Sequence, residues 1–500
     1  MRDDASSEIR PDATTPLLPL AAEASEPDLG PAPASAEVVA VPGAVPRHDL
    51  LRGDIRSAVF WLALPVLGEQ LLNAMVAWND TLLAGRIDAV ATAAVGFGAY
   101  VSWLVSMLFS LAGIGATAIV ARHVGENRPR RANHACNQAL LLSIVVGAVG
   151  MAAVWFAVGP MVRGLGLSAA AAPIAITYIR IDAIGYVPES FLFVGAACLR
   201  GAGDTRTPLK LIGAVQVINA LASWALTFGF GPIPAIGTPG IAVGTTVARA
   251  VAGVMTLIVL LRGRHGLRLS APHFQPDLRA IERIVRIGLP AAVDGGLMWG
   301  GHFAFMAILT RSALRGADYS GDVLYAAHIV GIRIESLSYM PAWAWGLAAS
   351  TLVGQNLGAG QRHRALRCAR EARRQALWAL LVPAALFLLA ARPAYQLLTN
   401  DPRVVECGVP ALRALAFLQP FVATLIVYLG ALRGAGDTLV PMSFTLVGMF
   451  AVRVPLAYFG GVVFQGGLLG AWAGMFADLV LRSVLMNRRL RSGRWAKKRI

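Results

Sequence analysis

Polar and ionisable residues that recur along one apolar segment are the first place to look for chemistry in this sequence. Glu69, Asn73, Val76 and Asp80 follow one another at spacings of three or four residues, so a helix would carry all four on one face. A charged side chain within hydrocarbon costs about 2.5–3.5 kcal/mol on insertion scales and is a functional candidate by default. A carboxyl group in apolar surroundings can hold a proton and release it when water enters. We therefore expect Asp80, assisted by Glu69, to bind and release a proton.

Asp80 also has a structural alternative, in which it caps the end of its helix and pairs there with Arg86. In the functional case, a cation bound beside the carboxylate favours the ionised form, so cation and proton compete for one site. Pro65, earlier in the same segment, can bend the helix and leave a backbone carbonyl free.

The second half of the chain has ionisable residues of its own in apolar sequence. His328 and Glu335 are seven residues apart and share a helix face, and Arg453 and Asp478 are flanked by apolar residues. We expect a polar network of these four residues, with two open roles: ordering the helices, or taking part in ion binding. Asp294 is expected nearer the end of its helix, in contact with water.

An internal repeat organises the whole chain. The seven residues Leu199–Thr205, LRGAGDT, return unchanged at Leu432–Thr438, an offset of 233 positions. Pro65 corresponds to Pro290 with an offset of 225, and the difference of eight lies in a longer polar loop around 311–322. The chain is therefore two copies of one unit.

The repeated motif itself predicts a connector between helices. Gly201 and Gly203 permit a tight turn, and Asp204 or Thr205 can cap the helix that follows. Arg200 is expected in water at the helix end.

The composition places the chain in a membrane. It is 56% hydrophobic and 14% charged, with a mean hydropathy of +0.61, and about twenty helical residues cross the hydrocarbon. We predict an all-α integral membrane protein with twelve transmembrane helices in two six-helix repeats, an N-lobe and a C-lobe, around a central cavity. The apolar runs are 56–85, 91–121, 133–160, 172–199, 207–230, 238–262, 283–311, 323–354, 366–391, 408–432, 440–463 and 468–487.

Charge predicts the orientation. Basic residues crowd one alternating set of loops, whereas the loops 231–237 and 461–467 have none. By the positive-inside rule, the LRGAGDT loops and both termini face the cytoplasm of a cell whose plasma or inner membrane holds the protein. Six helices per repeat make the repeats parallel, which suits two lobes that rock about a cavity. The formal charge of +16 does not indicate nucleic-acid binding, because the charges lie in short loops and a tail.

Four regions follow from these patterns. Residues 1–50 are expected to be a disordered cytoplasmic tail, 51–265 the N-lobe, 266–490 the C-lobe and 491–500 a basic cytoplasmic tail. The four cysteines are scattered without metal-ligand spacing, so we expect neither a metal nor another cofactor. HExxH and GxSxG are absent from the sequence, which argues against an enzyme.

Several motifs in order resemble the multidrug and toxic compound extrusion (MATE) family. The signature LRGAGDT-x-x-x-P stands at Leu199–Pro208 and again at Leu432–Pro441, and VGQNLGAGQ spans Val353–Gln361. Asp80-Thr81 followed by Ala84-Gly85-Arg86 is similar to the end of the family's first helix. Arg453–Tyr458, RVPLAY, resembles the DinF-like branch. The resemblance covers roughly 51–490.

The resemblance implies an antiporter that exports amphiphilic, often cationic organic compounds and is driven by protons, with sodium as the alternative ion. It aligns Asp80 with the family's helix-1 aspartate and Asn219 with the asparagine of an Asn-x-x-x-Asp pair on helix 5. Ser223 stands where that pair has its aspartate, so coupling rests more heavily on Asp80. Met298 stands where sodium-coupled members carry a glutamate, which disfavours sodium.

Aromatic and amide side chains are the candidates for a substrate cavity, because aromatic faces attract flat cations; the alternative is ordinary packing. The candidates are Asn73, Trp78, Tyr339 and Trp343. We expect a small organic substrate and membrane lipid as partners, and a monomer. A flippase for lipid-linked precursors, which would need a strongly basic cavity, is the alternative transporter, and an intramembrane enzyme is the alternative of another class.

Overall fold

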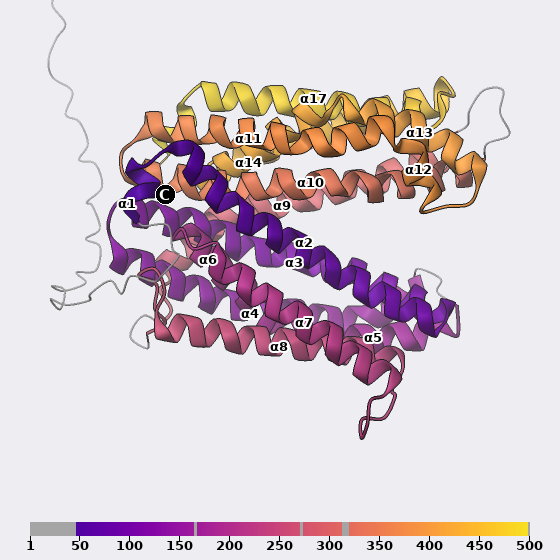
Figure 1. Ribbon diagram of the computed structural model, residues 1–500, viewed down its shortest axis with the longest axis horizontal. Helices are drawn as coiled ribbons and strands as arrows, with labels where there is room; N and C mark the ends of the chain where they lie inside the picture. Colours follow the sequence, from indigo (N-terminus) through magenta and orange to yellow (C-terminus); the bar gives the residue numbers. More distant parts are fainter. Residues whose placement is uncertain (1–46, 165–167, 271–273, 313–319, 499–500) are drawn as a thin grey trace, which may run out of the picture. The chain divides into compact units, whose positions relative to one another are not determined.

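The computed structural model describes residues 47–164, 168–270, 274–312 and 320–498, all of which belong to one compact unit of residues 41–500. Most of the expected N-terminal tail, 1–46, and the last two residues of the basic tail lie outside the described residues. The helices of the first half (Figure 1) are α1 Arg47–Arg52, α2 Ile55–Ile87, α3 Ala89–Gly125, α4 Pro129–Gly164, α5 Ala171–Ile184, α6 Tyr186–Gly201, α7 Arg206–Phe228 and α8 Thr238–Arg262.

The second half repeats this order. Its helices are α9 Leu278–Leu309, α10 Gly321–Gly358, α11 Arg362–Leu389, α12 Ala391–Gln396, α13 Pro402–Ala416, α14 Gln419–Gly434, α15 Leu439–Leu446, η2 Val447–Arg453, α16 Val454–Tyr458, η3 Phe459–Val463, α17 Gly467–Arg491 and η4 Arg494–Lys497. Within the described residues, nine helices are long and apolar enough to cross a membrane, or eleven if each of two bent pairs is one span; the 38-residue α10 is a further long helix of the bundle. The prediction of an all-α, twelve-helix membrane protein is confirmed.

The bent pairs fall at the same place in the two repeats. A 47° bend separates α5 from α6 and a 62° bend separates α13 from α14, whereas the sequence analysis gave one continuous apolar run in each case. Gly185 stands at the first break.

Aspartate side chains begin several helices, because a carboxylate can accept hydrogen bonds from the free N–H groups of a first turn. Asp54 accepts from the N–H of Ser57 at the start of α2, and Asp88 from that of Ala91 at the start of α3. In the LRGAGDT loop, Asp204 accepts from the N–H groups of Arg206 and Thr207. Of the two capping candidates in that loop, the aspartate is therefore the one that acts.

In each half, the first turns of the first long helix pack in the core of the other half. The turns of α2 up to Val66 belong to the core of the second half, and those of α9 around Ile284 and Ile287 belong to the core of the first half. Figure 1 shows α2 crossing from the orange helices to the magenta ones. Pro65 and Pro290 lie inside these helices, close to the crossing points.

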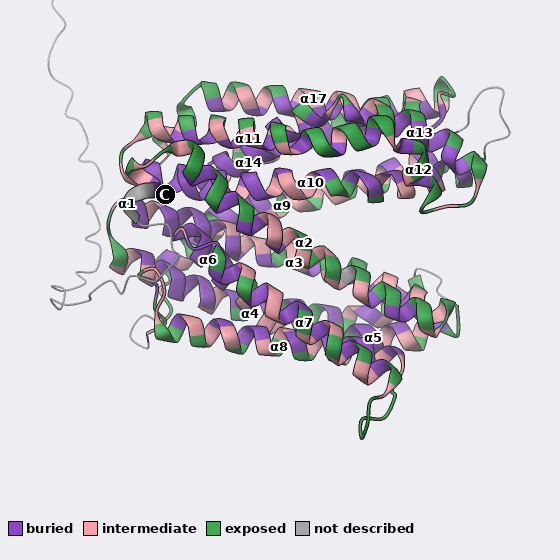
Figure 2. Ribbon diagram, viewed as in Figure 1, coloured by how far each residue is buried: buried purple, intermediate pink, exposed green. Residues whose placement is uncertain are grey.

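Glycines let the halves touch closely at the end where α3, α6, α10, α14 and α17 terminate, which we call the basic end. A Cβ added to Gly125 would overlap the carbonyl of Gln355, and one added to Gly358 would overlap that of Arg122. The side chain of Gln355 donates to the carbonyl of Gly201 at 2.9 Å. The VGQNLGAGQ motif is thus a contact between halves, and Figure 2 shows the adjoining turns of α3 and α10 as buried.

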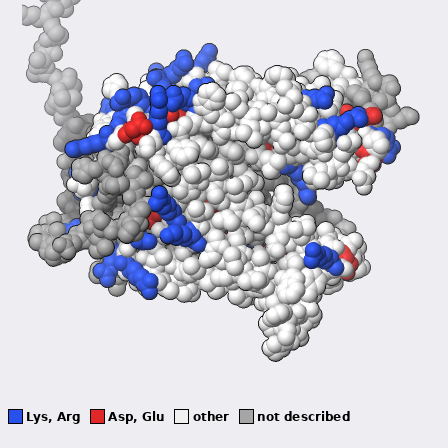
Figure 3. All heavy atoms as spheres, in the orientation of Figure 1, with Lys and Arg blue, Asp and Glu red and all other residues white. Residues whose placement is uncertain are grey.

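The halves separate toward the opposite end. Figure 3 shows the surface hollowed there between the two groups of helices, and it shows Lys and Arg gathered mainly at the basic end. Large side chains of α2 and α3 are accessible on that side of the molecule, with Trp78 66% exposed and Tyr100 52% exposed.

Candidate functional site

Asp80 lies at the meeting point of α2, α7 and α8, and only 8% of it is exposed. Its Oδ2 is 3.3 Å from the hydroxyl of Thr245, which accepts a hydrogen bond from Asn219 at 2.9 Å. Asn79 donates to Asn219 in turn at 3.2 Å. The other carboxylate oxygen of Asp80, Oδ1, has no hydrogen-bond partner in the part of the chain that the structure describes. The helix-end cap with Arg86 is not the arrangement found.

The contact with Thr245 can serve both protonation states of Asp80. The hydroxyl has one proton, and either the carboxylate of Asp80 or the carbonyl of Ile241, 3.0 Å away, can accept it. When Asp80 is ionised, the hydroxyl of Thr245 donates its hydrogen to the carboxylate. When Asp80 is protonated, the hydroxyl donates to the carbonyl of Ile241 and accepts a hydrogen bond from the carboxyl group of Asp80. Rotation of one hydroxyl therefore accommodates proton uptake and release.

Ser223 is fully buried behind this chain. Asn219 is 3.5 Å from its hydroxyl, which donates to the carbonyl of Ile241 at 3.3 Å. A Cβ on Gly244 would overlap Ser223, so α7 and α8 pack too closely at this point for added bulk. Ser223 therefore extends the hydrogen-bond chain without adding a titratable group.

Glu69 is held by Arg200. The two side chains are buried, with Nη1 of Arg200 at 3.0 and 3.2 Å from the two carboxylate oxygens. The expectation that Arg200 lies in water was wrong, because the motif's turn directs it inward to a carboxylate. Asp294, also expected in water, is buried and 2.7 Å from Arg433.

A second group of charges in the first half was missed by the sequence analysis. Arg249 on α8 is 2.8 Å from Asp182 on α5 and 3.2 Å from Glu189 on α6, and Ser102 donates to Asp182 at 2.5 Å. All three charged residues lie in the apolar runs 172–199 and 238–262, so the rule that singled out Asp80 would have found them.

In the second half, Asp478 is the centre of the charges. Arg482, which the sequence analysis did not single out, donates two hydrogen bonds of 2.6 Å to it, and Arg453 lies 4.0 Å away. Glu335 is buried and accepts from Tyr339 at 3.0 Å. His328 accepts at Nδ1 from Trp472 at 3.0 Å. The four predicted members are all buried, but His328 and Glu335 have different partners.

The substrate-cavity candidates divide into two pairs. Asn73 and Trp78 are exposed on α2. Tyr339 is bound to Glu335, and Trp343 lies under the guanidinium of Arg433 at 5.8 Å. Trp103 of α3 and Trp299 of α9 add an aromatic contact between the halves, with ring centroids 3.9 Å apart.

Groups suited to metal chemistry are not among these features: the described ranges contain no cluster of three or more His, Cys, Asp or Glu side chains that could hold a metal ion. The arrangement is instead one of buried carboxylates in hydrogen-bond chains between helices. Such chains can hold and pass a proton.

Comparison with known proteins gives the family. The MatE family model matches residues 65–225 and 297–459. "Probable multidrug resistance protein NorM" of Thermotoga maritima is 31% identical over 453 residues, 89% of this chain and 94% of that protein. "Multidrug resistance protein PmpM" of Pseudomonas aeruginosa is 26% identical over 446 residues, 88% of this chain and 92% of that protein.

Solved structures agree with this fold. A "MOP superfamily transporter from Pyrococcus furiosus" has a TM-score of 0.83 and 21% identity, and covers 91% of this chain and 100% of its own. An "outward-facing conformation of a multidrug resistance MATE family transporter" has a TM-score of 0.82 and 20% identity, with coverage of 91% and 100%. At these identities the likeness bears on the fold alone. The DinF-like branch stays a prediction. With most of its length matched by the family model and a relative 31% identical over 89% of it, this multi-pass membrane protein belongs to the MATE (MatE) family of transporters and is not an enzyme.

Proposed function

We propose that the protein exports amphiphilic, mainly cationic organic compounds in exchange for protons, by alternating access of its two lobes. Two relatives named as multidrug resistance proteins support the substrate class. The parallel repeats support two lobes that move as units. We further propose a monomer in the plasma or inner membrane, with the basic end and both termini in the cytoplasm.

The observation that carries the proton coupling is the environment of Asp80. Its carboxylate is buried, one oxygen faces a hydroxyl that can donate or accept, and the other has no partner among the described residues. Such a group can bind a proton without a change in its neighbours beyond the rotation of Thr245. In the proposed cycle, the protonated form is the buried one, and a cationic substrate stabilises the ionised form after water enters.

The charge balance of the first half supports a cation-exchanging role. Among the described residues, Asp182 and Glu189 share one guanidinium, that of Arg249, and Asp80 has no ion-pair partner. A surplus of carboxylates attracts protons and cationic substrates to this half.

Water must reach Asp80 for the cycle to turn. The carboxylate is enclosed by α7 and α8 in the conformation described, and Pro65 lies four turns before it on α2. We propose that α2 moves at Pro65, where the i−4 hydrogen bond is missing, and opens the contact between Asp80 and Thr245.

The alternatives receive less support from the buried charges of the two halves. A sodium site at Asp478 would have to displace the two hydrogen bonds from Arg482, whose Nη1 also contacts the sulfur of Met298 at 3.2 Å. A flippase would need a strongly basic cavity, but Arg249 and Arg482 are both paired with carboxylates, and Arg453 lies 4.0 Å from the carboxylate of Asp478.

The test is uptake of a cationic dye into everted vesicles, whose cytoplasmic face is outside, with imposed pH or sodium gradients. We expect a pH gradient to drive transport in the wild-type protein, with a sodium gradient at equal pH without effect. Asp80→Asn should abolish the response to the pH gradient. Asp88→Asn is the matched control, because it removes one carboxylate from the next helix start while an Asn can still cap α3. An unchanged pH response in Asp80→Asn would refute the role of Asp80.

A further inference from the structure

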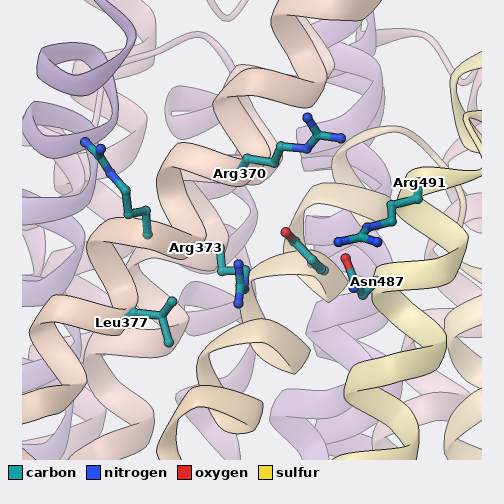
Figure 4. A pocket seen from close by; sticks show the side chains of 7 residues that line it. Arg370, Arg373, Leu377, Asn487 and Arg491 are labelled. Atoms are coloured by element: carbon teal, nitrogen blue, oxygen red, sulfur yellow. The ribbon is translucent and has the colours of Figure 1, made fainter.

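A pocket between three helices at the basic end is not explained by the proposed transport. It has a volume of about 450 Å³ and lies between α11, α14 and α17. Figure 4 shows Arg370 and Arg491 reaching toward each other from α11 and α17, with Asn487 next to Arg491. Arg373, Arg374 and Tyr428 also line it. No carboxylate is among the lining residues.

The guanidinium groups around this pocket differ in their partners. Arg373 donates through Nε to Thr424 at 2.8 Å, and its guanidinium lies 6.0 Å from the ring of Tyr428. These contacts hold a positive charge in place without neutralising it. Neither Arg370 nor Arg491 has an ion-pair partner within the ranges described. Arg374, the fourth arginine of the wall, pairs with Glu371 at 2.9 Å. The guanidinium groups of Arg370, Arg373 and Arg491 repel one another around one cavity, and an anion between them relieves the repulsion.

The planar guanidinium favours a particular anion. Arginine binds phosphate through two parallel N–H···O bonds, which a lysine cannot reproduce. A neighbouring cavity shares Arg370 and Arg374 with this pocket, but its wall also includes the carboxylates of Asp54 and Glu371. The pocket without carboxylates is therefore the one suited to a phosphate.

The surface beyond the pocket is apolar. Leu377 is part of the wall, and Leu381 follows it by one turn on the same face of α11, 54% exposed. On α17, Val484 is exposed about one turn before Asn487. Trp378, next to Leu377, is 68% exposed, and exposed tryptophans of membrane proteins are enriched at the level of the lipid headgroups. A ligand with its phosphate in the pocket would lay its apolar part on this surface.

We propose that this pocket binds the phosphate headgroup of an anionic phospholipid of the cytoplasmic leaflet, with the acyl chains along Leu381 and Val484. The site is separate from the carboxylates proposed for transport, and it makes the second half of the transporter sensitive to anionic lipid. Juxtamembrane arginines attract anionic lipids in general. Here the arginines line one cavity, which gives the bound headgroup a defined place.

Native mass spectrometry of the purified full-length protein, titrated with phosphatidylglycerol or with phosphatidylcholine, tests the proposal. We expect the wild-type protein to prefer phosphatidylglycerol by at least about tenfold in affinity, and Arg370→Gln/Arg491→Gln to lose the preference. The control Arg362→Gln/Arg367→Gln removes the same charge from the start of the same helix and should keep it. Equal retention in both double variants, or no preference in the wild-type protein, would overturn the proposal.

Two further arms separate the sources of the phosphate. Excess inorganic phosphate should leave the lipid bound. Leu381→Gln/Val484→Gln should weaken the binding of the lipid but not the binding of inorganic phosphate. If inorganic phosphate displaces the lipid at equal concentration, the pocket is a site for a soluble anion and the lipid assignment is wrong. Arg370→Lys/Arg491→Lys, which keeps both charges, should fold as the wild-type protein does and retain part of the preference. A complete loss there would mean that the paired hydrogen bonds of the guanidinium groups, and not charge alone, hold the phosphate.

Discussion

Glu69 and Arg200 form a buried ion pair whose counterpart in the other repeat is Asp294 with Arg433. The distances are 3.0 Å and 2.7 Å, and the acids and the arginines correspond at the offsets of 225 and 233 positions that relate the repeats. Each acid follows its helix's internal proline by four residues. The first turns of α2 and α9 pack on the other half of the molecule. Just after those turns, each ion pair links the helix to its own half.

The first prediction concerns that tie. Glu69→Gln leaves Arg200 as a buried charge without its carboxylate, so we expect a loss of about 3–5 kcal/mol in the free energy of unfolding. The double variant Glu69→Gln/Arg200→Gln should lose less than the sum of the two single changes. Chemical denaturation in detergent measures both, with the exposed Glu282→Gln as a control expected to change stability by less than about 0.5 kcal/mol. Additive losses would show that the pair is not coupled.

The second prediction concerns the hydroxyl beside Asp80. Thr245→Val keeps the shape of the side chain but removes a hydrogen bond worth about 0.5–1.5 kcal/mol. We expect dye efflux driven by a pH gradient to slow by roughly 2- to 10-fold. Thr245→Ser, which retains the hydroxyl, should transport at nearly the wild-type rate. If the valine variant matched the serine variant, the hydroxyl would have no part in proton transfer.

A third prediction follows from Asp277, which caps α9 outside the membrane spans. Partial burial opposes its ionisation, but hydrogen bonds from His134 and from the N–H groups of Ala280 and Arg279 outweigh burial and hold the pKa of Asp277 below its usual value. A carboxylate with a lowered folded pKa stabilises the protein above its unfolded pKa of about 3.9 and loses that effect as the pH falls through the folded value.

Asp277→Asn isolates this charge, because the amide oxygen can still cap the helix. We expect the variant to be less stable than the wild-type protein by roughly 1 kcal/mol at neutral pH, with the gap closing below about pH 3.9. Unfolding in detergent across this pH range measures the gap. A gap independent of pH would mean that the carboxylate's charge does not stabilise the helix start.

The fourth prediction concerns the C-terminal residues. Asp437, the counterpart of Asp204 in the second LRGAGDT loop, is fully buried and lies 2.7 Å from Arg489 and 2.9 Å from Lys498. Removal of its carboxylate in Asp437→Ala should cost about 1–3 kcal/mol. Lys498→Met removes a partly exposed partner and should cost less than about 1 kcal/mol. Equal thermal shifts in the two variants would contradict this ranking.

Much of the fold follows from hydropathy and repetition. Apolar runs of membrane-spanning length predict the helices, because helices satisfy their backbone groups internally in lipid. The bend at Gly185 was missed, since both α5 and α6 remain apolar and periodicity carries no signal for a change of direction. The exchange of the first turns of α2 and α9 was missed for a similar reason: an apolar face does not specify which half covers it.

Individual charges show where sequence reasoning about the site succeeds and fails. The rule that intramembrane charges matter singled out Asp80, and it would have found Arg249 had it been applied to every run. It could not choose partners. Arg200 was expected in water because it stands at a helix end beside a loop, yet the turn at Gly203, with φ of +95°, comes just after it and Glu69 lies within reach. Glu69 and Arg200 are 131 positions apart, so only the folded structure shows that they are partners.

Proton movement by the purified protein tests the central claim most directly. In liposomes that trap a pH-sensitive dye, an outward-directed gradient of a cationic substrate is imposed with no gradient of protons or sodium. We predict that substrate leaving the lumen draws protons inward, so that the lumen acidifies with wild-type protein and with Asp88→Asn but not with Asp80→Asn. Substrate efflux without any change in luminal pH, or acidification that persists in Asp80→Asn, would contradict the account.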